Sequence, residues 1–356
     1  AVSQFTLSTE KLYDRCVKNS TVIGPGNRRR IMALINNKFR RLVFSLSIPL
    51  LLSTFVIEPV LAQRPEFLAK NSAEIEVLPV QGSISMIATG GSNIAVMVGE
   101  LGLIVVDSGN AEASENLVNA IGELSSLPPR YIISTAALPS HLAGNVAIND
   151  IRGQDVLIGV NQDVGIPIVG HANGLTLLVT EFAGEIPYEF WPNNTFFGES
   201  KALYLNGEPI EILHQPAAIT QSDVLVHFRG SDVLVTGDIF DTTSYPHFYS
   251  EYGGSLQGLI DALNNVIEIA VPEFNQQGGT LIIPGHGRLA SESDVVEYRD
   301  MVTIIRDRVQ LMINEGMSFE EILAAQPSLE YDGIYGHDSG EWTTRMFLEA
   351  VYEELR

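Results

Sequence analysis

The sequence contains a single cysteine, Cys16, among its 356 residues. An internal disulfide needs two cysteines, so a disulfide-stapled fold and a cysteine-rich zinc module are both excluded. Positive charge is also scarce, since 21 Lys and Arg stand against 43 Asp and Glu and give a formal net charge of −22. A chain this acidic repels a phosphate backbone, so we expect no nucleic-acid partner. The hydrophobic share of 45% supplies enough apolar material for a large core.

The scarce positive charge is concentrated near the start of the chain. Residues 1–64 carry ten Lys and Arg against three Asp and Glu. A basic cluster at 38–41 precedes a run of sixteen uncharged residues, 42–57, and the small residues around Ala62 follow. This order is typical of a cleaved signal peptide. The alternative is a membrane anchor, which needs about 20 apolar residues, and this run is shorter.

These features divide the chain into four expected segments. We expect 1–31 to be an upstream extension, 32–62 a signal peptide, 63–74 a linker, and 75–356 one folded domain. A protein exported in this way is periplasmic or secreted, and it has no stable membrane insertion once the signal peptide is removed. The sequence contains no sign of the oligomeric state.

The folded domain alternates between groups of strands and single helices. Runs separated by glycines predict strands at 83–89, 93–98 and 103–107, followed by a helix at 111–124. Further strands are predicted at 130–135, 156–160, 202–205, 209–213, 224–228, 233–236 and 281–283, with a helix around 256–266. This order predicts an α+β protein with two similar halves, in which the sheets pack face to face, the helices lie outside and extra helices follow at the C-terminus.

Five short segments carry a family resemblance. They are Val106–Gly109 (VDSG), Ser134–Asn145 (STAALPSHLAGN), Leu213–Asp223 (LHQPAAITQSD), Thr236–Phe240 (TGDIF) and Ile283–Gly287 (IPGHG). In their order and spacing they resemble the metallo-β-lactamase superfamily, over about residues 75–356. The resemblance implies an αββα sandwich and a hydrolase in which two metal ions activate water.

The resemblance also identifies which metal ligands are missing. The family motif His-x-His-x-Asp-His falls on residues 136–141, where Ala136 and Leu138 replace the two histidines and Ser140 replaces the aspartate. A third histidine of the family falls on Ile219. Every imidazole of the first metal site is therefore absent, and we expect no two-metal centre in this chain.

Three of the family's ligands remain, namely His141, Asp238 and His286. Two imidazoles and one carboxylate are able to bind a single Zn²⁺ or Fe²⁺ ion with a position open for water. On this hypothesis all three residues are metal ligands, and His141 and Asp238 belong to the catalytic centre. The alternative is a cleft without metal, in which the same polar side chains bond to their neighbours.

Two further histidines are candidates for contact with a substrate. His247 follows Asp238 closely in the sequence and is able to reach the same cleft. His171 stands where members of the family often carry a loop near the mouth of the site. In the family, the residue that corresponds to Asp107 is buried and organises loops, so we assign Asp107 a structural role.

Two functions remain open. The first is an exported hydrolase of the metallo-β-lactamase type, in which one metal ion activates water for attack on an ester, amide or lactone. The second is a catalytically inactive relative that needs no metal and binds a small molecule or a partner protein in the same cleft. The fold hosts many reactions, so the sequence identifies no substrate.

Overall fold

The computed structural model describes residues 75–90, 92–151, 165–275 and 278–356. The expected extension, signal peptide and linker, together with the strand expected at 156–160, lie outside these residues. Within the described ranges, no helix combines the length and the apolar character that crossing a membrane requires.

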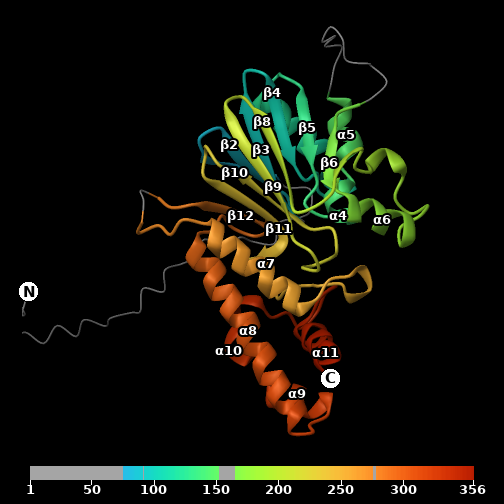
Figure 1. The fold of residues 1–356 in the computed structure, drawn as a ribbon, viewed down its shortest axis with the longest axis vertical. Coiled ribbons are helices and arrows are strands. Elements are labelled where there is room, and N and C mark those ends of the chain that lie inside the picture. The colour runs from blue at the N-terminus through green and yellow to red at the C-terminus, as the bar shows by residue number, and fades with distance from the viewer. Residues whose placement is uncertain (1–74, 91, 152–164, 276–277) are drawn as a thin grey trace, which may run out of the picture. The chain divides into compact units, whose positions relative to one another are not determined.

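Seven strands in chain order form the first sheet (Figure 1). These strands are β1 (Glu76–Gln81), β2 (Ile84–Ala88), β3 (Asn93–Gly99), β4 (Gly102–Val106), β5 (Pro129–Ile133), β6 (Ile168–His171) and β7 (Asn194–Phe196). The first four are antiparallel neighbours, whereas β4 to β7 pair in parallel. Parallel neighbours need crossover connections. The connections contain η1 (Ala111–Ala113), α3 (Ser114–Leu124), α4 (Pro139–Leu142), α5 (Asn145–Asp150), α6 (Ala172–Thr180) and η2 (Tyr188–Phe190).

Five strands form the second sheet, in the order β12-β11-β10-β9-β8. They are β8 (Ser200–Leu205), β9 (Glu208–His214), β10 (Val224–Phe228), β11 (Val233–Asp241) and β12 (Leu281–His286). β8 to β11 form antiparallel hairpins, and β12 joins β11 in parallel after η3 (Ser250–Tyr252) and α7 (Leu256–Ile269). The two halves are therefore less similar than the sequence predicts, because their sheets contain seven and five strands.

Alternation of side chains along the strands builds the sandwich. Met86 and Met97 point toward the second sheet and belong to a buried cluster that contains Val226 of β10. Ile87 and Val96, one residue along in each strand, belong instead to the cluster that contains α3. Since successive side chains of a strand point to opposite faces, the first sheet packs on the second sheet with one face and on a helix with the other.

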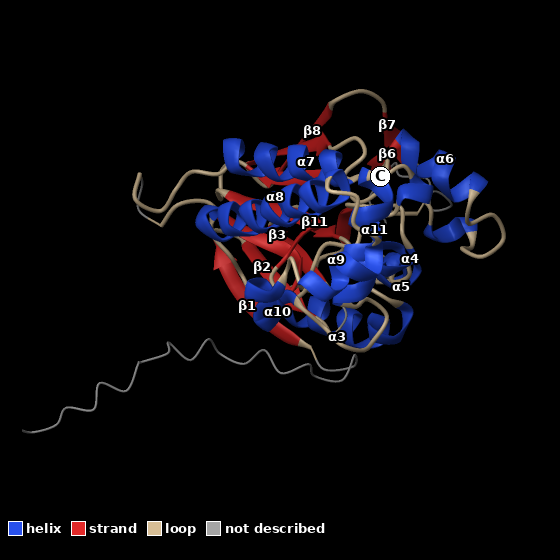
Figure 2. Cartoon of the chain, turned by 90° about the horizontal axis from the view of Figure 1, so that it is seen from below, coloured by secondary structure: helices blue, strands red, loops and turns tan. Residues whose placement is uncertain are grey.

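Helices cover the outer face of the second sheet in the same way. Leu259 and Leu263 of α7 share a buried cluster with Leu225 and Leu234 of the sheet. Figure 2 shows α7 and α8 (Glu292–Asn314) side by side over these strands. The fold is thus the αββα arrangement that the sequence predicts.

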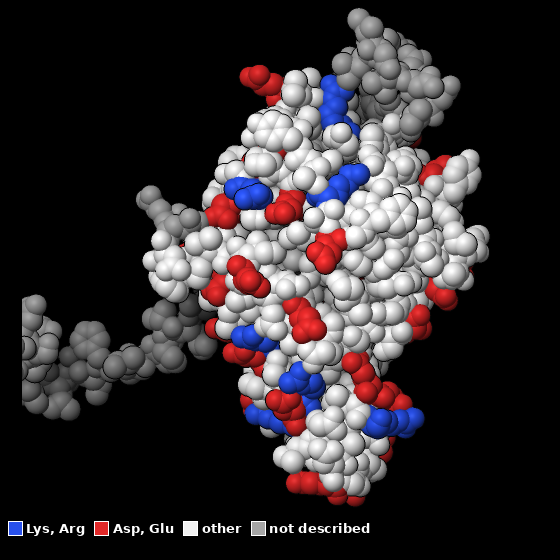
Figure 3. Space-filling model, viewed as in Figure 1, with Lys and Arg blue, Asp and Glu red and all other residues white. Residues whose placement is uncertain are grey.

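The C-terminal part consists of helices, as the sequence predicts. After α8 come α9 (Phe319–Ala325), α10 (Leu329–Tyr335) and α11 (Thr344–Leu355). Ser291 and Ser318 form capping boxes at the starts of α8 and α9. Arginines and carboxylates alternate on the surface of these helices (Figure 3).

Candidate functional site

The remaining family ligands lie where strands of both sheets end. Asp107 follows β4, and β5 leads through Thr135 to α4, which contains His141. Asp238 stands on β11 just after Gly237, where the pairing of β11 with β12 shifts its register. His286 is the last residue of β12. Since β4 and β5 are parallel, and so are β11 and β12, each pair of strands delivers its residues to one edge of its sheet.

The Asp107 side chain fixes the position of the His141 ring. It accepts hydrogen bonds from the backbone N–H of Thr135 (2.8 Å) and from the Thr135 hydroxyl (2.6 Å). Its Oδ2 also lies 3.1 Å from Nδ1 of His141. Asp107 is 2% exposed and adopts a positive φ of 65°, a backbone conformation that is uncommon outside glycine. The structural role predicted for Asp107 therefore includes direct contact with a candidate site residue.

The other end of the His141 ring meets Asp238. Nε2 of His141 lies 3.0 Å from Oδ2 of Asp238, and Nε2 of His286 lies 3.3 Å from Oδ1 of the same carboxylate. Oδ1 is buried, and the contact with His286 does not have the geometry of a hydrogen bond. The result is a continuous chain of charged groups, Asp107–His141–Asp238–His286, which we call the charge chain.

The charge chain runs from the interior to the surface. The side chain of His141 is 3% exposed, that of Asp238 22% and that of His286 34%. Burial lowers the pKa of His141, but the carboxylates of Asp238 and Asp107 outweigh burial and raise this pKa well above its ordinary value. Burial raises the pKa of Asp238, but the two imidazoles outweigh it and hold this pKa well below its ordinary value. The pairs therefore favour a carboxylate beside protonated imidazole.

The residues at the positions of the three missing histidines belong to the hydrophobic core. Ala136 is 4% exposed, Leu138 5% and Ile219 1%, and all three lie in the cluster that contains α7 and α8. None of these side chains carries an atom able to bind a metal ion. The first of the two metal sites implied by the resemblance is thus occupied by packed apolar side chains.

The three remaining ligands lie together, but they contact one another. A zinc site needs its donors around a common point, at about 2.0–2.2 Å for nitrogen and oxygen. In the part of the chain that the structure describes, no group of three His, Cys, Asp or Glu side chains has an arrangement able to hold a metal ion. The nitrogens of His141 and His286 face different oxygens of Asp238, so the side chains as they lie do not fit the expected metal.

His247 lies in an aromatic stack. Its ring stacks on Trp342 with centroids 3.7 Å apart and lies 4.1 Å from the ring of Tyr249. Burial lowers the pKa of His247, although the charge of Asp238 acts in the opposite direction. The charge of Asp238 therefore acts on His247. The ring of His247 packs against its aromatic neighbours and not against the residues of the charge chain.

His171 lies apart from the charge chain, beside the missing ligand positions. It is 6% exposed, and its ring stacks on His214 with centroids 3.5 Å apart. Burial, as the larger cause, and the charge of the nearby His214 together lower the pKa of His171 to about 4. His171, Ser134 and Ala136 line a cavity of about 10 Å³, which is about the least space that holds one water molecule and far less than a substrate needs.

Two residues of the site, Thr135 and Asp107, were not predicted from the sequence to contact His141 directly. Thr135 bonds to Asp107 and lies 3.1 Å from Nδ1 of His141 through its hydroxyl. The signal in the sequence was the Asp-Ser-Gly segment after a strand together with Ser134-Thr135 after the next one. Whether such residues meet depends on which strands pair, and that information was available only through the resemblance.

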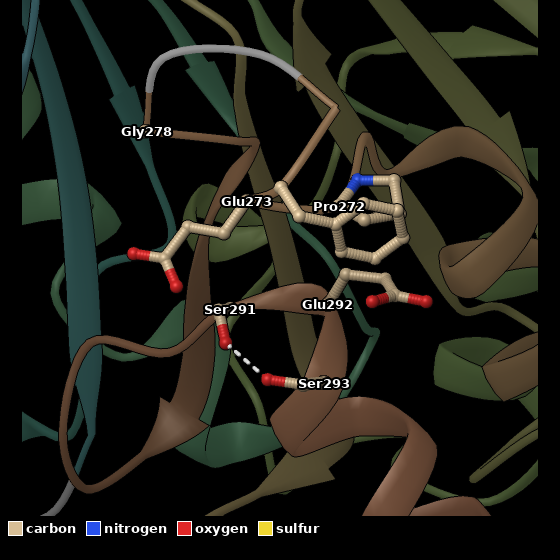
Figure 4. A pocket seen from close by; sticks show the side chains of 7 residues that line it. Pro272, Glu273, Gly278, Ser291, Glu292 and Ser293 are labelled. Atoms are coloured by element: carbon tan, nitrogen blue, oxygen red, sulfur yellow. Dashed lines mark hydrogen bonds between the residues drawn. The ribbon is translucent and has the colours of Figure 1, made fainter. Parts of the chain in front are cut away.

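A larger cavity lies elsewhere in the molecule. It has a volume of about 450 Å³ and lies between the segment after α7 and the start of α8 (Figure 4). Ser291 and Ser293 bond to each other at one side of it, and Glu273 and Glu292 also line it. None of the candidate site residues contributes to this cavity.

Comparison with known proteins identifies relatives of the fold only. No protein-family model matches the chain, and no curated protein sequence does. The stereoselective inverting sec-alkylsulfatase Pisa1 from Pseudomonas sp. superposes with a TM-score of 0.58 at 14% identity, covering 80% of this chain and 51% of that one. A double mutant of the same sulfatase gives 0.60 at 14% identity, over 78% and 50% of the two chains.

A smaller enzyme also matches. A metallo-β-lactamase from Pontibacter korlensis gives a TM-score of 0.50 at 16% identity, covering 65% of this chain and 99% of that one. This chain spans about half the length of the alkylsulfatase. At these identities the likeness extends to the fold and not to the reaction.

Proposed function

We propose that this chain, which has the metallo-β-lactamase fold and hence a hydrolase-type scaffold, acts by binding a ligand and not by metal-dependent hydrolysis. One observation carries the proposal: the retained imidazoles pair with the Asp238 carboxylate, while apolar side chains fill the positions of the three missing histidines. A hydrolase of this fold needs a metal-bound water. The donor set as arranged offers no such position.

The proposed ligand is a small molecule at the exposed end of the charge chain. Asp238 and His286 are the members of the chain with the greatest exposure. The aromatic stack of Trp342, His247 and Tyr249 lies close enough for the Asp238 charge to act on His247 and Tyr249. Aromatic faces beside a carboxylate and an imidazole suit a molecule with both an apolar surface and a polar group.

Metal content is the test of this proposal. The protein is purified without added metal, dialysed against Zn²⁺ or Fe²⁺, and analysed for bound metal by mass spectrometry under native conditions. We expect no stoichiometric metal, and no hydrolysis in a panel of lactams, lactones, thioesters and sulfate esters.

A matched pair of variants makes the result specific. The double variant His141→Ala/His286→Ala removes both imidazoles of the charge chain, whereas His337→Ala removes an exposed histidine of the C-terminal part. Stoichiometric metal that disappears in the double variant and persists in His337→Ala would overturn the proposal and establish the one-metal site. Hydrolysis with the same pattern would establish a one-metal hydrolase.

We also propose export, on the basis of the sequence alone. The basic cluster, the sixteen-residue apolar run and the small residues near Ala62 support a cleaved signal peptide and a periplasmic or secreted mature protein. N-terminal sequencing of the protein from its native cell tests this, and we expect a mature start near Gln63. Recovery of the protein from the cytoplasm with the basic cluster at 38–41 still attached would contradict export.

A further inference from the structure

The C-terminal helices enclose a groove that the candidate site does not use. It has a volume of about 620 Å³ and is bounded by α9, α10, α11 and the loop that joins the last two helices. Pockets for small ligands have volumes of about 300–1,000 Å³, so the groove has the size of a ligand site. None of the charge chain residues lines it, and neither does the aromatic stack.

A glycine forms part of the groove wall without a structural reason. Gly333 lies inside helix α10, where glycine is less favourable than alanine because it loses more backbone freedom on folding. Its φ is not positive, and a Cβ built on it meets no atom within 4 Å. Neither the backbone nor packing therefore requires glycine here. What glycine does provide is a bare backbone that a ligand is able to approach closely.

A buried hydroxyl in the same wall has no partner. Ser328 is 1% exposed and lines the groove, and its Oγ forms no hydrogen bond within the described residues. A buried polar group without a partner is destabilising, so native proteins usually supply one from the protein, from water or from a ligand. This hydroxyl is the second, independent sign that the groove accepts a polar group.

The charges that line the groove favour a positively charged ligand. Asp332 and Asp338 contribute carboxylates, and Asp332 accepts one hydrogen bond from the Tyr245 hydroxyl (2.8 Å). The guanidinium of Arg345 also lines the groove, but it forms an ion pair with Glu320 at 2.6 Å. The charge of Arg345 is therefore already balanced, and the two carboxylates leave an excess of negative charge.

We propose that this groove binds a small aliphatic amine. Its ammonium group donates hydrogen bonds to Asp332, Asp338 and the Ser328 hydroxyl, and its hydrocarbon part lies against the bare backbone of Gly333. The ammonium group has three donors and no acceptor, which matches a wall of carboxylates and an unpartnered hydroxyl. This inference is independent of whether the charge chain binds a metal or a ligand.

The experiment uses the purified protein with putrescine and spermidine as probes, in isothermal titration calorimetry at low and high salt. Glucose, a neutral molecule, and succinate, a dianion, serve as comparison ligands. We expect the amines to bind, with an affinity that falls as salt screens the carboxylates, and the comparison ligands not to bind. Equal binding of glucose would overturn the assignment to amines.

Two leucine variants locate the site. Gly333→Leu fills the groove, and we expect it to weaken amine binding by about tenfold or more. Gly122→Leu is the matched control, because Gly122 is also a helical glycine whose Cβ would meet nothing within 4 Å, and it lies in α3 away from the groove. We expect this control to bind the amines like the parent. Parent-like binding in Gly333→Leu would overturn the proposal.

A third variant tests the charge without disturbing the core. Replacement of Asp332 removes the acceptor of the Tyr245 hydroxyl, so its effect on binding would be mixed with an effect on folding. Asp338→Asn is the cleaner choice because Asp338 is exposed. We expect weaker amine binding and a smaller salt dependence in Asp338→Asn. No amine binding to the parent at millimolar concentration would overturn the proposal, whatever the metal analysis of the charge chain shows.

Discussion

Two neighbouring parts of the molecule differ in how they are packed, although the family resemblance assigns both to one metal centre. In the first part, Ala136, Leu138 and Ile219 are apolar and belong to the hydrophobic core. In the second part, His141, Asp238 and His286 are ionisable and pair with one another. The first part is stabilised by burial of apolar surface, and the second by contacts between opposite charges.

The comparison teaches that a buried polar centre is stable in two cases. Either every charged group keeps its partner, or apolar side chains replace all of the groups together. A buried ion pair replaced as a whole by packed apolar side chains is often as stable as before, whereas removal of one partner leaves an uncompensated charge. The apolar part of this molecule is a complete replacement. In the charge chain the charged groups keep their partners, because each imidazole nitrogen of His141 faces a carboxylate.

The largest expected effect comes from breaking the charge chain at its centre. Asp238→Ala removes the partner of Nε2 of His141 and leaves that buried imidazole with Asp107 alone. We expect a loss of about 4 kcal/mol in the free energy of unfolding, within the range for a buried pair that loses one partner. Urea denaturation measures it. Glu297→Ala, which removes an exposed carboxylate of α8, is the control and should change stability by less than about 0.5 kcal/mol. A loss below about 1 kcal/mol in Asp238→Ala would show that the pairing contributes little.

The sequence predicted most of the fold because alternation and glycine turns identify regular strands. The strand expected at 93–98 is β3 (Asn93–Gly99), and the one expected at 224–228 is β10. β11 is longer than the expected 233–236, because Gly237 adopts a positive φ of 52° at a register shift and pairing with β12 continues beyond it. β6 and β7 escaped prediction, since strands of four and three residues are too short for a periodic pattern.

The candidate site was less predictable than the fold. Its members come from four separate segments of the chain, and no local pattern relates Asp107 to His141 or Asp238 to His286. The resemblance supplied the positions of the three remaining ligands. It did not supply their mutual pairing, because whether a nitrogen faces a metal ion or a carboxylate oxygen depends on side-chain rotations within the folded protein. For the same reason the stack of His247 on Trp342, two residues far apart in the chain, had no sequence signal.

The next largest loss of stability is expected in the apolar part, at Ile219. Ile219→Ala removes buried methyl groups from a side chain that is 1% exposed, at a position where the family carries a metal ligand. We expect a loss of about 3 kcal/mol, in the range for a large-to-small change in a core. Ile304→Ala makes the same change at a side chain that is 37% exposed and should have a clearly smaller effect in the same urea experiment. Equal losses in the two variants would mean that Ile219 is not packed as the core requires.

The pH dependence of stability should differ in sign between the two parts. Burial and His214 lower the pKa of His171, beside the apolar part, to about 4. Between pH 6.5 and 4 the unfolded chain therefore binds a proton at this residue that the folded protein does not bind. This contribution to stability is therefore lost as the pH falls through that window. The raised pKa of His141 acts in the opposite direction, because its contribution is complete below pH 6.5 and is lost as the pH rises through the raised value.

A single variant separates these two contributions. His171→Asn keeps an acceptor for the backbone N–H of Asn173 and removes the titrating ring. In denaturation series at several pH values, we expect the loss of stability between pH 6.5 and 4 to be smaller in His171→Asn than in the parent. NMR titration provides the direct reading, in which His171 stays neutral at a pH where His286 is protonated. An unchanged acid slope in the variant would contradict the assignment.

The smallest expected effect lies at the exposed end of the charge chain. The side chain of His286 is 34% exposed, and its contact with Oδ1 of Asp238 at 3.3 Å does not have hydrogen-bond geometry. Contacts between partly solvated charges contribute little, so His286→Ala should cost less than about 1 kcal/mol in urea denaturation. The comparison with Asp238→Ala then gives the gradient of pairing strength from the interior to the surface. If His286→Ala were as destabilising as Asp238→Ala, the charge chain would act as one cooperative unit. His286 at its exposed end would then not be free to exchange its contact with Asp238 for a ligand.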